Sequence, residues 1–172
     1  MKHSAGIILI VILALAGCKK ENDARTSGTD TIDNLRYLST TWYTYGFSFS
    51  TAKLVSTEAT PKPDITIDTA FAQRPNAYLQ GSINSSFYKY GAYNDEASAI
   101  AAFDALKQVN VTAWEDWANP VSVNDIWIFK STGEKYTKIR IVNLKQEKIQ
   151  GVTVTEVTFQ WVHQPDGSLT FP

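Results

Sequence analysis

Two tryptophans close together in a predicted loop are the side chains best suited to contact a ligand. Trp114 and Trp117 lie three residues apart. Flat indole rings can stack on a ligand, which would make this segment a platform for glycans. Nearby tyrosines could add further stacking faces, namely Tyr88, Tyr90 and Tyr93. The alternative is that both indoles anchor the loop on the core, and the sequence leaves this choice open.

Groups that could perform catalysis are sparse. A Ser-His-Asp or Cys-His site needs a positioned base, and His163 lies at the end of a predicted strand with no nucleophile motif to serve. Glu115 and Asp116 are adjacent, so they point in different directions in any strand and form a poor catalytic pair. The sequence also has no metal-ligand cluster and no glycine-rich phosphate loop. We therefore expect a binding protein rather than an enzyme.

Cys18 is the single cysteine of the chain, and it ends the motif Leu-Ala-Gly-Cys. The apolar run before it, residues 6–16, follows Lys2 and is shorter than the roughly 20 residues that span a bilayer. Residues 1–17 therefore predict a signal peptide. The four-residue motif resembles the lipobox of bacterial lipoproteins. That resemblance implies acylation of Cys18 with diacylglycerol and a further palmitate-type chain, and hence a membrane anchor. A chance cysteine after a plain signal peptide is the alternative.

Charge and composition limit which kind of domain would follow the anchor. The chain has 16 Lys and Arg against 17 Asp and Glu, a balance that does not favour nucleic acid as a partner. Residues 18–31 are almost entirely polar and predict a flexible tether. Residues 32–172 are long enough for one domain with its own core. The charged residues after Cys18 resemble the surface-export signals of Bacteroidetes lipoproteins, which implies an outer-membrane location with exposure at the cell surface.

Strand patterns dominate the rest of the chain. Residues 42–50 alternate, with Tyr43, Tyr45, Phe47 and Phe49 on one face. Further strands are expected over residues 53–55, 64–68, 126–130, 135–142 and 152–163. In the last of these the apolar residues change phase, which predicts a β-bulge near Glu156. The fold class expected is mostly β, an antiparallel, sandwich-like single domain.

One helix is expected, over residues 94–109. Asn94 is a suitable N-cap residue, and the acidic residues after it complement the positive end of the helix dipole. Ile100, Phe103 and Leu106 recur at three-residue spacing and form an apolar stripe. We expect this helix to cover one face of a sheet.

Several of the predicted strands share their pattern with a known family. Gly133 precedes a Tyr-Thr-Lys-Ile-Arg-Ile stretch at residues 136–141, and residues 157–168 read Val-Thr-Phe-Gln-Trp-Val-His-Gln-Pro-Asp-Gly-Ser. Towards the front are Phe-Ser-Phe-Ser-Thr at residues 47–51 and Pro-Asp-Ile at residues 63–65. In this order the stretches resemble the HmuY-like lipoproteins of Bacteroidetes. Together they cover about half of the mature chain.

That resemblance implies a β domain that binds haem and passes it to a TonB-dependent outer-membrane receptor. Haem iron takes axial donors such as His, Met, Cys or Tyr. Known members use a pair of His or Met in their central region, whereas residues 72–125 contain neither. No family ligand carries over, and His163 is the remaining candidate haem ligand. The alternative is a glycan-contacting or accessory surface lipoprotein that partners an outer-membrane receptor without binding haem.

Overall fold

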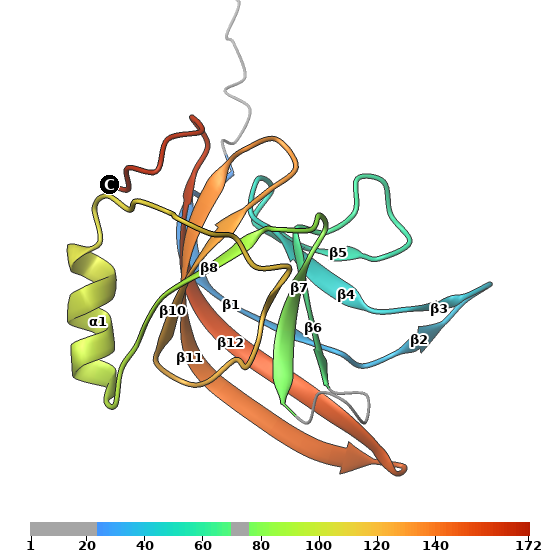
Figure 1. The fold of residues 1–172 in the computed structure, drawn as a ribbon. Helices are drawn as coiled ribbons and strands as arrows, with labels where there is room; N and C mark the ends of the chain where they lie inside the picture. The colour runs from blue at the N-terminus through green and yellow to red at the C-terminus, as the bar shows by residue number, and fades with distance from the viewer. Residues whose placement is uncertain (1–23, 70–75) are drawn as a thin grey trace, which may run out of the picture.

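Two antiparallel sheets of five strands each pack face to face in the computed structural model, which describes residues 24–69 and 76–172 (Figure 1). The first sheet has the order β1-β12-β11-β10-β8 and the second the order β5-β4-β6-β7-β9. The bounds in the first sheet are β1 (Ser27–Asp33), β8 (Phe87–Ala92), β10 (Asp125–Lys130), β11 (Tyr136–Ile149) and β12 (Val152–Gln164). Those in the second are β4 (Tyr45–Ser48), β5 (Lys53–Ser56), β6 (Ile65–Thr69), β7 (Ala77–Gly81) and β9 (Trp117–Ala118). The mostly β, sandwich-like fold class is thus confirmed.

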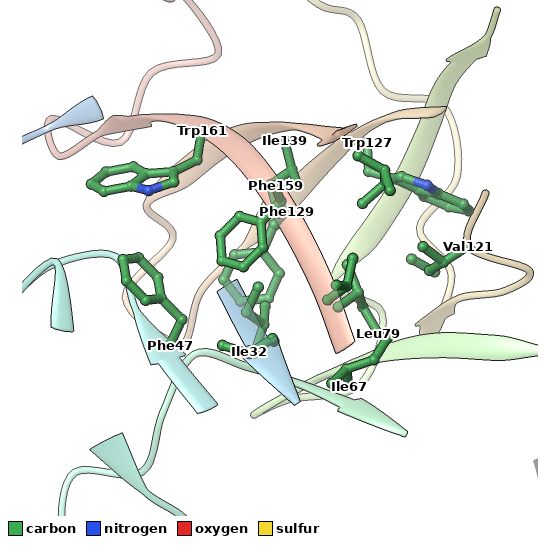
Figure 2. Close-up of a cluster of buried hydrophobic side chains, with 14 of the residues drawn as sticks. Ile32, Phe47, Ile67, Leu79, Val121, Trp127, Phe129, Ile139, Phe159 and Trp161 are labelled. Carbon is green, nitrogen blue, oxygen red and sulfur yellow. The ribbon is translucent and has the colours of Figure 1, made fainter. Parts of the chain in front are cut away.

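The core lies between the inner faces of the two sheets and is rich in aromatic rings (Figure 2). Phe47 of the second sheet contacts Phe159 and Trp161 of the first, with ring centroids 5.5 and 5.4 Å apart. Alternate residues of β12 are buried from Thr155 to His163, which is the period expected of a strand with one face on a core. Burial of these rings supplies most of the stability of the sandwich.

The register shift falls in β11 rather than in β12. β12 keeps a single phase throughout, and the pairing with β11 shifts between Ile141 and Asn143. The bulge expected near Glu156 is therefore wrong in its position. Val152 and Val154 lie on the outward side of β12, so their apolar character does not report a change of face.

The N-terminal edge of the first sheet starts earlier than the sequence predicts. Residues 27–31 were expected in the tether, but β1 pairs antiparallel with β12 from Ser27 to Asp33. Backbone hydrogen bonds to β12 hold this polar stretch, so it needs little apolar burial of its own. Asp30 adds a side-chain bond, since its Oδ2 accepts from the indole Nε1 of Trp161 at 2.7 Å. The described residues therefore shorten the predicted tether at its C-terminal end.

Helix α1 (Glu96–Ala105) covers the outer face of the first sheet, as expected (Figure 1). It is shorter than residues 94–109, because Asp95 rather than Asn94 is the N-cap and accepts from the backbone N–H of Ser98 at 2.8 Å. Phe103 is buried, but Ile100 is 38% exposed, so the predicted stripe is wrong at that position. The buried neighbour on this face is the smaller Ala99.

A buried lysine joins α1 to the sheet beneath it. Lys138 of β11 is 2% exposed, and its Nζ donates to the carbonyl oxygens of Phe103 and Leu106 at 2.7 and 3.0 Å. These carbonyls belong to the end of the helix, where no further turn supplies donors. Burial lowers the pKa of Lys138, and the neighbouring Lys107 lowers it further.

Two hairpins project beyond the body of the sandwich (Figure 1). One is formed by β2 (Tyr37–Leu38) and β3 (Trp42–Tyr43), which pair only with each other. The other is the far end of β11 and β12, where Ile149 pairs with Val152. The strand expected over residues 42–50 is thus divided, with its first part in the β2–β3 hairpin. No helix within the described ranges is long and apolar enough to cross a membrane.

Candidate functional site

Backbone hydrogen bonds hold the tryptophan-bearing segment against both sheets. Glu115 and Phe87 exchange two bonds, from Glu115 N–H at 2.7 Å and from Phe87 N–H at 2.9 Å. Two residues later, β9 pairs with the edge of β7, with Trp117 opposite Gln80. The segment is therefore fixed at two points, on β8 of the first sheet and on β7 of the second. A segment held in this way presents its side chains in a defined geometry.

Both predicted tryptophans line one hollow of about 490 Å³. It is open to solvent, and its lining consists of Ser85, Trp114, Glu115, Asp116, Trp117 and Asn119. We call this hollow the tryptophan groove. It combines two aromatic ring surfaces with two carboxylates, an amide and a hydroxyl.

Trp114 is packed as the predicted anchor and also lines the groove. Its ring stacks on Tyr136 with centroids 6.0 Å apart at an interplanar angle of 22°. The ammonium of Lys130 lies 4.8 Å from the Trp114 ring centroid, in a cation–π contact. The indole also packs on the cluster under α1 that contains Phe103. Trp114 is therefore a half-buried anchor that contributes one wall of the groove, while Trp117 supplies a second half-buried ring.

The polar side of the groove is partly pre-arranged. Asp116 accepts from the backbone N–H of Ser85 at 2.8 Å through Oδ1, and from the Ser85 hydroxyl at 3.4 Å. Ser85 has a positive φ of 53°, which turns its backbone towards that carboxylate. The Glu115 side chain is exposed at the same groove. One carboxylate is thus fixed by the 84–86 turn, and the other is free to meet a ligand.

Tyr93 lies outside the tryptophan groove. It packs, partly buried, against the cluster formed by Phe103, Leu106 and Ile126 beneath α1. Burial raises the pKa of Tyr93, and the neighbouring Tyr90 raises it further. The structure therefore does not bring Tyr93 together with the two tryptophans as a stacking face of one groove.

His163 is buried at the end of β12 rather than partly exposed. Its residue is 5% exposed, Nδ1 is 2.9 Å from the hydroxyl of Thr137, and its ring stacks on Phe49 with centroids 6.3 Å apart. Burial lowers the pKa of His163, and the charge of Lys135 lowers it further. The ring is thus held neutral within the edge of the core.

These surroundings do not fit a haem-iron ligand. An axial ligand needs an accessible nitrogen beside an apolar slot large enough for the macrocycle, and here His163 is 5% exposed and one face of its ring stacks on Phe49. Within residues 24–69 and 76–172, no group of three or more His, Cys, Asp or Glu side chains could hold a metal ion. Haem binding therefore stays a prediction.

Two groove residues were missed by sequence reasoning. Ser85 reaches the groove from a turn 31 residues before Asp116, a pairing set by the fold and without a local signal. Asn119 precedes Pro120 at the end of the loop, where the Asn-Pro pair indicated only a turn. Cys18 lies outside the described residues.

The chain matches no family model and no curated protein in the comparisons with known proteins.

Proposed function

We propose that the protein is a membrane-anchored lipoprotein that binds glycans in the tryptophan groove. The observation that supports the proposal is the convergence of Trp114, Trp117, Glu115 and Asp116 on one open hollow. In the sequence these residues are neighbours, but adjacent strand residues would point to opposite faces. Here the segment from Trp114 to Trp117 places all four residues along the same hollow.

The chemistry of the groove matches that of a sugar ring. A pyranose has an apolar C–H face that packs on an aromatic ring, and it carries hydroxyl groups around its rim that need acceptors. Trp117 and the exposed part of Trp114 supply the stacking surface. Glu115 and Asp116 supply carboxylate oxygens, which form stronger hydrogen bonds to hydroxyl donors than neutral acceptors do. An open hollow of about 490 Å³ has room for one or two sugar units of a longer chain.

The proposal also includes a membrane anchor at Cys18 and a location at the outer membrane. Acylation of Cys18 would hold the domain at the outer membrane, with the groove available to external glycans. A TonB-dependent receptor is the partner that the HmuY-like resemblance supports, and uptake of captured ligand through such a receptor is the corresponding role. Mass spectrometry of the native protein tests the first step, because an unmodified thiol at Cys18 would remove the anchor.

Glycan binding is tested by screening the Cys18→Ser chain that begins at residue 18 on a glycan array. This chain contains every residue that the structure describes. We expect saturable binding of a defined glycan class, weakened about tenfold or more in Trp117→Ala, as for aromatic hot spots in other binding sites. The matched control is Trp42→Ala, which removes an exposed tryptophan on a different element. Equal binding by wild type and Trp117→Ala would contradict the proposal.

A haemin titration of the same chain distinguishes the alternative function. A saturable Soret shift that His163→Ala abolishes would favour haem capture over glycan binding. The free-haemin spectrum is expected to remain unchanged, because His163 is buried inside the protein and is only 5% exposed.

A further inference from the structure

The β2–β3 hairpin carries an exposed apolar surface that the tryptophan groove does not use. Leu38 and Trp42 pair directly across the two strands and are 69% and 66% exposed. Directly opposed residues of an antiparallel pair lie on the same face, so these two side chains form one patch. Large side chains exposed together in this way mark an interaction surface.

The hairpin is braced, so that its patch is presented rather than folded away. On its other face, Tyr37, Tyr43 and Tyr45 form a trio with ring centroids 5.5 to 5.8 Å apart. At the turn, Glu58 accepts hydrogen bonds from the hydroxyls of Ser39, at 2.9 Å, and Thr41. The tyrosines hold the base of the hairpin and Glu58 holds its tip. Leu38 and Trp42 therefore point outward from a supported ribbon.

We propose that this hairpin surface rests on the lipid bilayer and orients the domain at the membrane. The inference rests on the proposed acylation of Cys18. Only six residue steps separate Cys18 from Ala24, the first described residue, and an extended chain spans at most about 3.3–3.6 Å per residue, or about 20 Å in total. A domain held so close to a bilayer has one of its surfaces within reach of the lipid. Tyr, Trp and Leu are the side chains suited to that interface, because Tyr and Trp combine an apolar body with a polar tip.

The other projecting hairpin shows what a surface without this role looks like. Ile149 and Val152 also pair directly and are exposed at its tip. The neighbouring residues Lys145, Glu147 and Lys148 are charged and exposed, and no aromatic side chain lies between Asn143 and Thr158. Charged side chains at a sheet edge oppose association. We therefore assign the lipid contact to the β2–β3 hairpin and not to the β11–β12 hairpin.

Vesicle flotation of the Cys18→Ser chain tests the hairpin without the acyl anchor. Vesicles of phosphatidylethanolamine and phosphatidylglycerol should carry the protein, and the Leu38→Ser/Trp42→Ser variant should bind about tenfold or more weakly. The matched control Ile149→Ser/Val152→Ser removes an equivalent cross-strand pair and should bind like the wild type. Brominated acyl chains should quench tryptophan fluorescence in the wild type, and this quenching should be lost in Trp42→Phe.

Three outcomes would overturn the inference. They are an absence of vesicle binding by the wild type, equal binding by the β2–β3 variant, and a dimer in solution that this variant dissolves, which would assign the patch to a second copy of the chain. Failure of the anchor would instead appear as an unmodified Cys18 in the native protein. Failure of glycan binding would appear only on the array, so the three claims are tested separately.

Discussion

The aromatic core and the tryptophan groove both use aromatic side chains, but the core buries them and the groove leaves them partly exposed. In the core, rings such as Phe47, Phe159 and Trp161 come from alternate strand positions and are fully buried between two sheets. In the groove, Trp114 comes from a loop bonded to β8 and Trp117 from the two-residue strand β9 on the edge of β7, and both rings are half-buried. Inward strand positions therefore direct aromatic residues into the core, whereas the segment that joins the two sheets keeps its rings partly exposed.

The largest effect on stability should come from a substitution in the aromatic core. Trp161→Ala removes a fully buried ring and the indole bond to Asp30, and should lower the free energy of unfolding by about 3–5 kcal/mol. Urea denaturation monitored by circular dichroism measures the change. Trp42→Ala, which removes an exposed tryptophan, serves as the control and should change stability far less. Similar losses in the two variants would show that Trp161 is not part of a tightly packed core.

A smaller loss is expected where the helix joins the first sheet. Lys138→Met keeps the apolar stem but leaves the carbonyls of Phe103 and Leu106 without their donor, at a cost of about 1–3 kcal/mol. In the variant, amide hydrogen exchange in α1 should become faster relative to the wild type, and it should change less in β11 and β12. Unchanged protection of α1 would mean that the lysine does not hold the helix.

The pH dependence of stability tests whether His163 is buried in the folded protein. Because folding lowers the pKa of His163, the unfolded chain binds more protons between that lowered pKa and the ordinary value of about 6.5. The contribution of His163 to stability is complete above about 6.5 and is lost as the pH falls through this window. His163→Gln should remove that loss.

Urea midpoints of wild type and His163→Gln measured across this range give the contribution by difference. The difference also removes the effect of Asp64, whose pKa is raised by burial. A constant difference between the two proteins across the range would contradict the account of a neutral, buried His163.

The smallest effect on stability is expected in the groove. Glu115→Gln replaces an exposed carboxylate that faces the hollow, and should change the free energy of unfolding by no more than about 0.5 kcal/mol. Glycan binding should nevertheless weaken, because a neutral amide accepts weaker hydrogen bonds than a carboxylate. A large loss of stability with unchanged binding would place Glu115 in the structural framework instead.

Local pattern was enough to predict the strands, because a half-buried strand repeats every two residues. Ile65, Ile67, Ile139 and Ile141 are buried as the alternation predicts. The pattern did not show that Lys138 and Arg140, on the outward face of the same strand, are covered by α1. It also missed β1, whose polar residues are ordered by pairing with a strand about 130 residues later.

The candidate site was only partly predictable for a similar reason. Trp114 and Trp117 stood out as large rings outside any strand pattern, and the structure brings them together in one groove. Tyr93 was equally conspicuous in the sequence, but packing beneath α1 removes it from the groove. Ser85 carries no signal in the sequence, because its role depends on a hydrogen bond to Asp116 across 31 residues.

The most direct test of the central claim is isothermal titration calorimetry of the array-selected glycan with wild type and Trp117→Ala at matched stability. We expect saturable binding by the wild type and a loss of about tenfold or more in affinity in the variant, with its folded structure unchanged. Wild-type protein that binds no glycan, or a variant that binds as well as the wild type, would contradict it.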